Sequence, residues 1–193
     1  MALAPTALTS KSDLQHNLFL LTLDNKLGLA PPNAPDSRVK RVLDVGTGTG
    51  IWAVDFGDEH PEAEEYDVFV KSDDDTLKPD HAVSRCVDLI YDASIKFGRP
   101  YQDIEPLAEM MKEVGFVDVA LHNDKWPSNA WARDPKYKEL GMWNHENMSS
   151  GVEGFTMAAF TRIHNWTKDE VQAFLVDVRK DLKDKSIHGY WTV

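Results

Sequence analysis

The chain has 193 residues, of which 42% are hydrophobic and 27% are charged, and its net charge is −11. The length is sufficient for one domain with a substantial core, and the composition is ordinary for a soluble globular protein. The acidic charge argues against nonspecific binding to nucleic acid, which requires a basic surface. No apolar run approaches the roughly 20 residues of a membrane span, so we expect no membrane partner.

The single cysteine, Cys86, excludes an internal disulfide framework and fits a reducing compartment. The N-terminus also lacks the basic and apolar regions of a secretory signal. We therefore expect the protein in the cytoplasm or the nucleus. Residues 1–12 are mostly small and include Pro, Ser and Thr, which predicts a disordered N-terminus. Residues 13–193 are predicted to form a single domain.

The first predicted helix covers residues 13–23 and places Leu14, Leu18 and Leu21 on one face. Further along, a short apolar strand is predicted at 41–45. It runs into a loop with three glycines.

This loop, Asp44-Val45-Gly46-Thr47-Gly48-Thr49-Gly50, is the most specific motif of the chain, and a helix is predicted directly after it at 51–57. The glycines allow the backbone to turn tightly and to approach a ligand, and the helix N-terminus offers free N–H groups. The motif is not a P-loop, because Ile51 and Trp52 stand where Lys and Ser/Thr are needed. It is not the dinucleotide fingerprint either, since one residue instead of two separates Gly48 from Gly50. A turn that only reverses the chain is the simpler alternative.

The loop resembles the first motif of class I S-adenosylmethionine-dependent methyltransferases. Segments 14–32, 48–56, 141–143 and 186–191 resemble fungal LaeA-like methyltransferases, so the resemblance covers most of the chain. It implies an α/β fold with a Rossmann-like sheet, flanking helices and a role in fungal secondary metabolism. That role is either the tailoring of a small-molecule substrate or regulation together with velvet-type proteins. The residues implied in S-adenosylmethionine binding are Asp44, Gly46, Thr47, Gly48, Thr49 and Gly50.

The chain departs from this family after the predicted helix. Residues 62–65 lead directly into residues 66–70, which resemble the fifth strand of the family. We therefore expect an incomplete Rossmann-like sheet without the second to fourth strands, which carry the ribose- and adenine-binding residues. The first strand would keep an unpaired edge. Either the remaining strands re-pair, or a protein partner or second copy covers the edge, or the sequence is an incomplete product.

Three functions remain open at this point. The first is methyl transfer to a small molecule. The second is a pseudo-methyltransferase that does not bind the cofactor and acts as a regulatory or scaffolding partner. The third is a pocket that now promotes another reaction, such as a cyclisation. No catalytic residue is assigned, because methyl transfer depends mainly on alignment of the acceptor. His122 or His145 could serve as a base, although a surface or hydrogen-bonded histidine is the commoner case.

The acidic run 72–75 is predicted to be a solvated loop. Carboxylates also bind metal ions, but the spacing fits no calcium loop. Amphipathic helices are predicted over 80–97 and 103–114, and a strand over 116–121. Cys86 shares the apolar face of the first of these helices, so we expect a buried core residue and not a nucleophile. The inward face of the second is predicted to consist of Ile104, Leu107, Ala108 and Met111.

Residues 125–143 are rich in aromatics, which could line a substrate site, a core or a protein interface. These aromatics are Trp126, Trp131, Tyr137 and Trp143. A helix is predicted over 142–163, in which Gly151 and Gly154 weaken the helix or mark a close crossing. The segment 167–170 is a capping box that opens a further helix. The apolar stripe of that helix is Val171, Phe174, Leu175, Val178 and Leu182.

Overall fold

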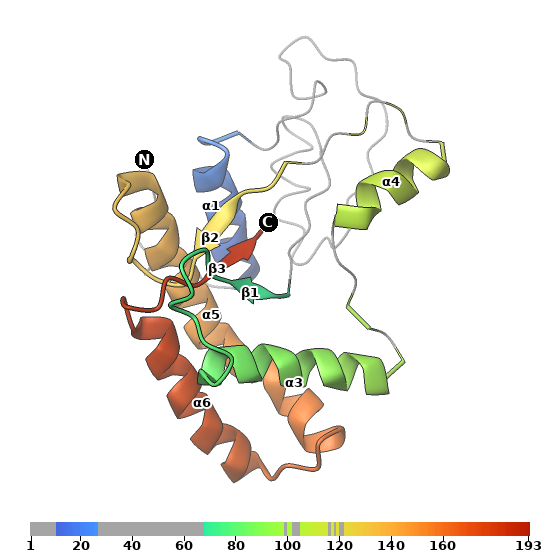
Figure 1. Cartoon of the computed structure of the whole chain (residues 1–193), viewed down its shortest axis with the longest axis vertical. Coiled ribbons are helices and arrows are strands. Elements are labelled where there is room, and N and C mark those ends of the chain that lie inside the picture. The colour runs from blue at the N-terminus through green and yellow to red at the C-terminus, as the bar shows by residue number, and fades with distance from the viewer. Residues whose placement is uncertain are drawn as a thin grey trace. The chain divides into compact units, whose positions relative to one another are not determined.

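The computed structural model describes residues 11–26, 68–98, 100–101, 105–115, 117, 119 and 122–193. Figure 1 traces the whole chain, which divides into two units, Met1–Glu65 and Tyr66–Val193. The glycine loop, the strand and helix predicted on either side of it, and residues 1–10 all lie outside the described residues.

In the first unit, the structure describes helix α1, Lys11–Thr22. The predicted N-terminal helix is therefore confirmed, with a slightly earlier start. Leu14 and Leu18 of its predicted apolar face are buried. The chain leaves the helix through Asp24 and Asn25, both of which have positive φ angles. Short polar side chains tolerate this left-handed conformation better than most other residues, so the helix ends here.

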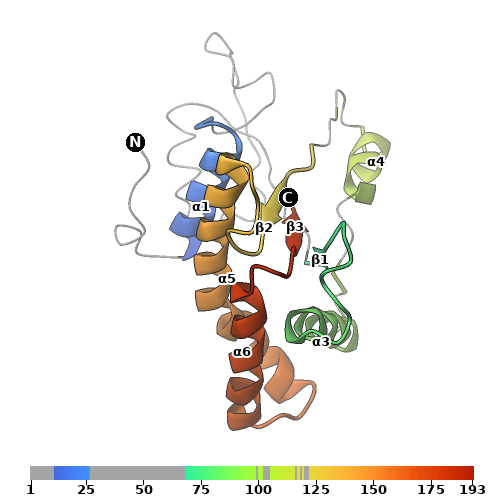
Figure 2. The ribbon, with the colours of Figure 1, turned by 60° about the vertical axis from the view of Figure 1, so that its left-hand side comes forward.

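The second unit contains four described helices: α3 (Ala82–Lys96), α4 (Glu105–Glu113), α5 (Pro135–Arg162) and α6 (Lys168–Lys183). Helices α5 and α6 lie side by side and α3 packs against both, as Figures 1 and 2 show. The residues buried at their contact are Val83, Cys86, Val152, Phe160, Val171, Leu175, Val178, Leu182 and Trp191. Apart from Trp191, which lies outside the helices, these side chains are three, four or eight positions apart along their helices, so each helix turns one stripe inward.

The boundaries of these helices follow local signals. The capping box at Thr167 is present. The Thr167 side chain accepts a hydrogen bond from the Glu170 N–H, and the Glu170 side chain accepts one from the Thr167 N–H. Helix α3 ends one residue before the predicted end, just ahead of Gly98, which adopts a φ of 77°. Helix α5 starts earlier than predicted, because Asp134 caps it and Pro135 occupies its first turn.

Helix α4 lies where a helix was predicted, but the assignment of its inward face is wrong in one respect. Met111 is 39% exposed, and its neighbour Met110 is 46% exposed. The periodicity of a helix identifies its apolar face, and it does not establish that another element covers that face.

Three short strands form an antiparallel sheet in the order β1-β3-β2. These are β1 (Val70–Lys71), β2 (Lys125–Pro127) and β3 (Tyr190–Thr192). The last strand of the chain is thus the central one, and it pairs Trp191 with Val70 on one side and with Trp126 on the other. The described part of the chain is a mixture of helices with a small sheet.

Of the three predicted strands, 41–45 lies outside the described residues, 66–70 is confirmed only at its end, and 116–121 is wrong at its described positions. Of the strand predicted at 66–70, the structure describes 68–70, and only Val70 is in a strand. Val117 and Val119, the described residues of the strand predicted at 116–121, are in none. The sheet instead uses β2 and β3, which have three residues each. Segments this short carry too little alternation to be recognised, and their pairing depends on partners far away in the sequence.

Candidate functional site

A polar network joins the acidic loop, residues 72–76, to the C-terminal segment, residues 186–193. The loop is folded around Asp74, whose Oδ1 accepts hydrogen bonds from Ser72 Oγ at 2.9 Å and Thr76 Oγ1 at 2.8 Å. The Thr76 N–H donates to the same oxygen at 3.2 Å. Such side-chain-to-backbone bonds are typical of Asp in tight turns. The turn leaves the other oxygen of Asp74 available for a distant partner.

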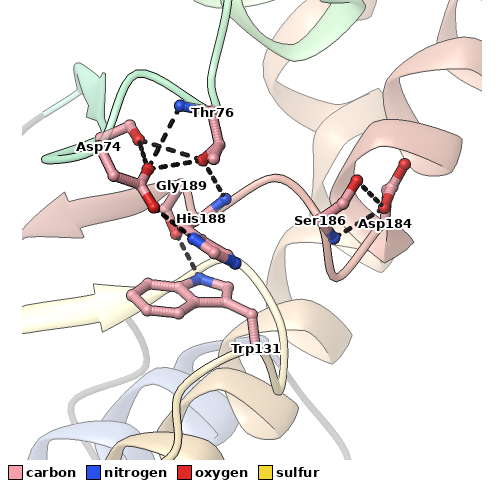
Figure 3. A network of polar contacts seen from close by, with 8 residues as sticks. Asp74, Thr76, Trp131, Asp184, Ser186, His188 and Gly189 are labelled. Carbon is pink, nitrogen blue, oxygen red and sulfur yellow. Dashed lines mark hydrogen bonds and ion pairs between the residues drawn. The ribbon is translucent and has the colours of Figure 1, made fainter.

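That partner is His188, whose Nδ1 lies 2.5 Å from Asp74 Oδ2, while its backbone N–H donates to Thr76 Oγ1 at 2.8 Å (Figure 3). Trp131 lies beside the imidazole, with ring centroids 4.9 Å apart, and its Nε1 donates to the carbonyl of Gly189 at 2.9 Å. The His188 ring is therefore fixed on one edge and on one face.

The electrostatics of this pair follow from the contacts. The hydrogen bond from His188 holds the pKa of Asp74 well below its usual range, with a further contribution from Thr76. Because an ionised carboxylate only accepts, Nδ1 of His188 must carry the shared proton. No described residue bonds to the other ring nitrogen, Nε2.

The C-terminal segment is positioned by the turn that follows α6. The Asp184 carboxylate accepts hydrogen bonds from the Ser186 N–H at 2.8 Å and Oγ at 2.7 Å (Figure 3), and these bonds lower the pKa of Asp184. The Gly189 carbonyl also accepts from the Ser128 N–H at 2.8 Å. The segment therefore enters β3 with its register already defined.

A second bridge connects the same two regions through Asp73. Lys125 Nζ lies 2.5 Å from Asp73 Oδ2, and the Tyr190 hydroxyl donates to Asp73 Oδ1 at 2.7 Å. The ammonium also lies 4.3 Å from the centre of the Tyr190 ring. The Lys125 bond lowers the pKa of Asp73 and the same contact raises the pKa of Lys125, whereas burial is the main cause of the raised Tyr190 pKa.

The acidic run was predicted to be a solvated loop, and the structure adds a specific role. The Asp73 and Asp74 side chains are 68% and 48% exposed, yet each holds a partner more than a hundred residues away. As for the metal alternative, the described residues contain no group of three or more side chains that could hold a metal ion. The run therefore serves as a tertiary contact.

Two of the three remaining nucleophile and base candidates, Cys86 and His145, are structural. Cys86 is buried, and burial raises the pKa of its thiol to about 12, so the thiol stays protonated and the predicted core role is confirmed. His145 Nδ1 lies 3.1 Å from the Leu182 carbonyl, and both ring nitrogens lie 3.4 Å from Ser149 Oγ. His145 is thus a hydrogen-bonded histidine between two helices, while His122 is exposed.

The aromatic region 125–143 is divided between roles. Trp126 and Trp143 are buried at 0% and 6% exposure and belong to the core. Trp131 holds the His188 ring, and Tyr137 is on the surface at 37% exposure. The sequence left substrate, core and interface open for this region, and the structure assigns two of its tryptophans to the core.

None of the residues predicted to bind S-adenosylmethionine can be placed in this geometry. Asp44, Gly46, Thr47, Gly48, Thr49 and Gly50 all lie outside the described residues. The structure instead emphasises His188, which sequence reasoning did not single out. The only feature of the sequence that pointed to His188 was its position in a segment that resembles the methyltransferase family, since its partner Asp74 is 114 residues away.

Among the described helices, none is long and apolar enough to cross a membrane.

Comparison with curated proteins identifies fungal relatives. The chain is 28% identical to a probable methyltransferase, tdiE, of Emericella nidulans, with 96% of the chain and 79% of that protein covered. It is 27% identical to the methyltransferase pytC of Aspergillus terreus, with coverages of 92% and 76%. It is 23% identical to the secondary metabolism regulator LAE1 of Cochliobolus heterostrophus, with coverages of 93% and 83%. No family model and no solved structure matches.

The predicted resemblance to fungal LaeA-like methyltransferases is therefore confirmed over nearly the whole chain. The alignment with tdiE extends over 254 residues, although the chain has only 193. The relative must therefore contain residues that have no counterpart here. A chain that lacks part of the methyltransferase sheet, as predicted, would produce such an alignment.

Proposed function

We propose that this chain is an S-adenosylmethionine-dependent methyltransferase-like protein that acts on a small molecule in fungal secondary metabolism. The observation that carries the proposal is the match to a fungal methyltransferase over 96% of the chain. Similarity to pytC and to LAE1 supports the same assignment. On this proposal, residues 13–193 form one domain with an incomplete Rossmann-like sheet.

The cofactor site in this proposal is the loop Asp44–Gly50. Gly46, Gly48 and Gly50 would let the backbone lie against the methionine part of the cofactor, and Asp44 would position its amino group or the loop. The sulfonium of S-adenosylmethionine supplies the reactive methyl group. The protein then has to align the acceptor with that group, which accounts for the lack of a catalytic signature in the sequence.

Calorimetry with S-adenosylmethionine tests the proposal. We expect saturable binding, and Asp44→Asn should lower the affinity about tenfold or more, as expected for loss of a charged hydrogen bond. Asp58→Asn removes the same charge outside the motif and should leave the affinity unchanged. Absence of binding by the folded protein at millimolar cofactor would refute the proposal.

A specific observation favours a second candidate, a pseudo-methyltransferase that acts as a regulatory or scaffolding partner. The relative tdiE has residues that this chain lacks, and the predicted loss includes the ribose- and adenine-binding strands. A homodimer or a protein partner would then cover the exposed sheet edge. Light scattering after size-exclusion chromatography decides between the candidates. A compact monomer that binds the cofactor would exclude the second one.

A further inference from the structure

A groove with a volume of about 450 Å³ lies between α3 and α5, where α3 lies across α5 (Figure 1). This volume is within the range of small-molecule sites. Its walls come from residues spaced three or four apart on the two helices, so two stripes face each other across it. The apolar lining includes Ile90, Ala93, Phe97, Phe155, Ala159 and Ile163.

The floor of the groove adjoins the helical core, since Ala93 is buried and Ile90 and Ala159 pack against the core residues. Cys86 of α3 and Phe160 of α5 point into that core and are buried. Phe97, Tyr101 and Phe155, by contrast, are 69%, 50% and 58% exposed. Three exposed aromatic rings around one groove form the kind of apolar patch that marks a binding surface.

The groove also carries a positive charge. Arg162 is the only charged side chain among the groove residues that the structure describes. No described residue pairs with its guanidinium, whereas Arg179 donates to the Ser149 carbonyl and Arg85 lies over the Phe174 ring. The chain has a net charge of −11, yet no described acidic side chain neutralises this guanidinium next to the apolar walls. An Arg fork is well suited to a carboxylate.

Two hydrogen bonds of Ser94 fix the polar edge of the groove. Ser94 Oγ donates to the Tyr91 carbonyl at 2.7 Å and accepts the Tyr101 N–H at 3.3 Å. Ser94 therefore holds the chain beyond α3 against that helix and keeps Tyr101 at the wall. The serine is occupied by these bonds, so Arg162 remains the group able to recognise a charged ligand.

We propose that the groove between α3 and α5 binds an apolar molecule that carries a carboxylate. The apolar part lies between Phe97 and Phe155, and the carboxylate pairs with Arg162. This site uses only residues of the second unit. It is independent of the glycine loop and of the proposed methyl transfer.

Octanoate and octanol form a matched pair of probes, because they differ in charge and share the same chain length. We expect octanoate to bind more tightly than octanol in calorimetry. Arg162→Gln should weaken octanoate about tenfold, as for loss of one charged hydrogen bond, and leave octanol unchanged. Arg133→Gln removes an exposed charge elsewhere and should change neither.

A second variant tests the groove itself. Ala158 lines the groove and is exposed, so Ala158→Trp should fill the groove without disturbing the core and abolish binding of both probes. Circular dichroism with urea unfolding verifies that each variant is folded. Asp44→Asn should leave octanoate binding unchanged, which separates this inference from the proposed cofactor site.

Several outcomes would overturn the inference. These are an absence of octanoate binding at millimolar concentration, an equal loss of both probes in Arg162→Gln, and unchanged binding in Ala158→Trp. Light scattering supplies one more. If the wild type is a dimer and Ala158→Trp is a monomer, the groove is occupied by a second copy and not by a small molecule.

Discussion

The helical core of the second unit and the contact between its acidic loop and C-terminal segment differ in chemistry and in exposure. In the core, Phe160 and Leu175 are fully buried among apolar side chains. In the loop contact, Asp74 and His188 share a hydrogen bond between side chains that are 48% and 37% exposed. Apolar burial stabilises in proportion to the area removed from water, whereas exposed ion pairs contribute little.

This difference indicates separate roles. The core supplies the stability of the fold, and the polar contact specifies where the last strand lies. The hydrogen bonds of His188 and Tyr190 to the acidic loop span 112 to 117 residues of sequence, and they fix β3 between β1 and β2. Four sets of substitutions test the comparison.

Phe160→Ala should have the largest effect. Phe160 is 0% exposed and lies 5.2 Å from the Trp166 ring centre and 6.0 Å from that of Phe174. Truncation should lower the free energy of unfolding by about 3–5 kcal/mol, through lost burial and the cavity left behind. Val176→Ala on the exposed side of α6 is the control and should cost less than about 0.5 kcal/mol. Urea unfolding measures both. Equal effects would show that the core is not closed.

Replacing two glycines of α5 by Ala should change the free energy of unfolding in opposite directions. A Cβ on Gly141 would lie 2.0 Å from the Asn129 carbonyl oxygen, so Gly141→Ala forces two backbones apart and should cost about 1–3 kcal/mol. Gly154 is exposed on the same helix, and Gly154→Ala should stabilise by about 0.5–1 kcal/mol through helix propensity. Unfolding midpoints compare the two. A stabilising Gly141→Ala would contradict the close approach.

Thr167→Ala removes the capping box at the start of α6. Thr167 Oγ1 accepts the Glu170 N–H at 3.2 Å, and Glu170 accepts the Thr167 N–H at 2.7 Å. The loss should be about 1 kcal/mol. Lys168→Ala, in the first turn of the same helix, should change stability by less than about 0.5 kcal/mol. If the two variants unfold alike, the cap does not stabilise the helix.

Asp74→Asn should change the free energy of unfolding least at neutral pH, and it should change how that free energy depends on pH in acid. The bond from His188 lowers the pKa of Asp74 in the folded state. A lowered folded-state pKa gives stability above the unfolded-state pKa, about 3.9, which is lost as the pH falls further. Asp74→Asn should therefore flatten the decline of the unfolding free energy below about pH 4. A slope should remain from Asp73 and Asp184, whose pKa values are also lowered.

Asp75→Asn is the matched control for this titration. Asp75 lies in the same loop with a φ of 57°, a conformation that Asn also tolerates. Its substitution should leave the acid-induced decline as in the wild type. A wild-type decline that Asp74→Asn does not change would show that the Asp74–His188 pair has no energetic role.

Local features of the fold could be predicted from the sequence, whereas contacts between distant segments could not. Helix α6 was predicted down to its capping box and its apolar stripe, because both signals are local in the sequence. Burial of Cys86 followed from the same periodicity. Strands β2 and β3 were missed, since each has three residues and takes its pairing from a distant segment.

The candidate sites divide in the same way. The glycine spacing at Asp44–Gly50 and the similarity to fungal methyltransferases point to one cofactor class without any coordinates. The partners of Asp73, Asp74 and His188 could not be predicted, and neither could the groove beside Arg162.

The sequence by itself determined where the helices lie, the capping box and apolar stripe of α6, and the family resemblance, because those depend on residues a few positions apart. Only the tertiary structure decided that the acidic run binds the last strand and that α3 and α5 leave an exposed groove. Contacts between residues more than a hundred positions apart depend on how the helices pack, and no short-range pattern encodes that packing.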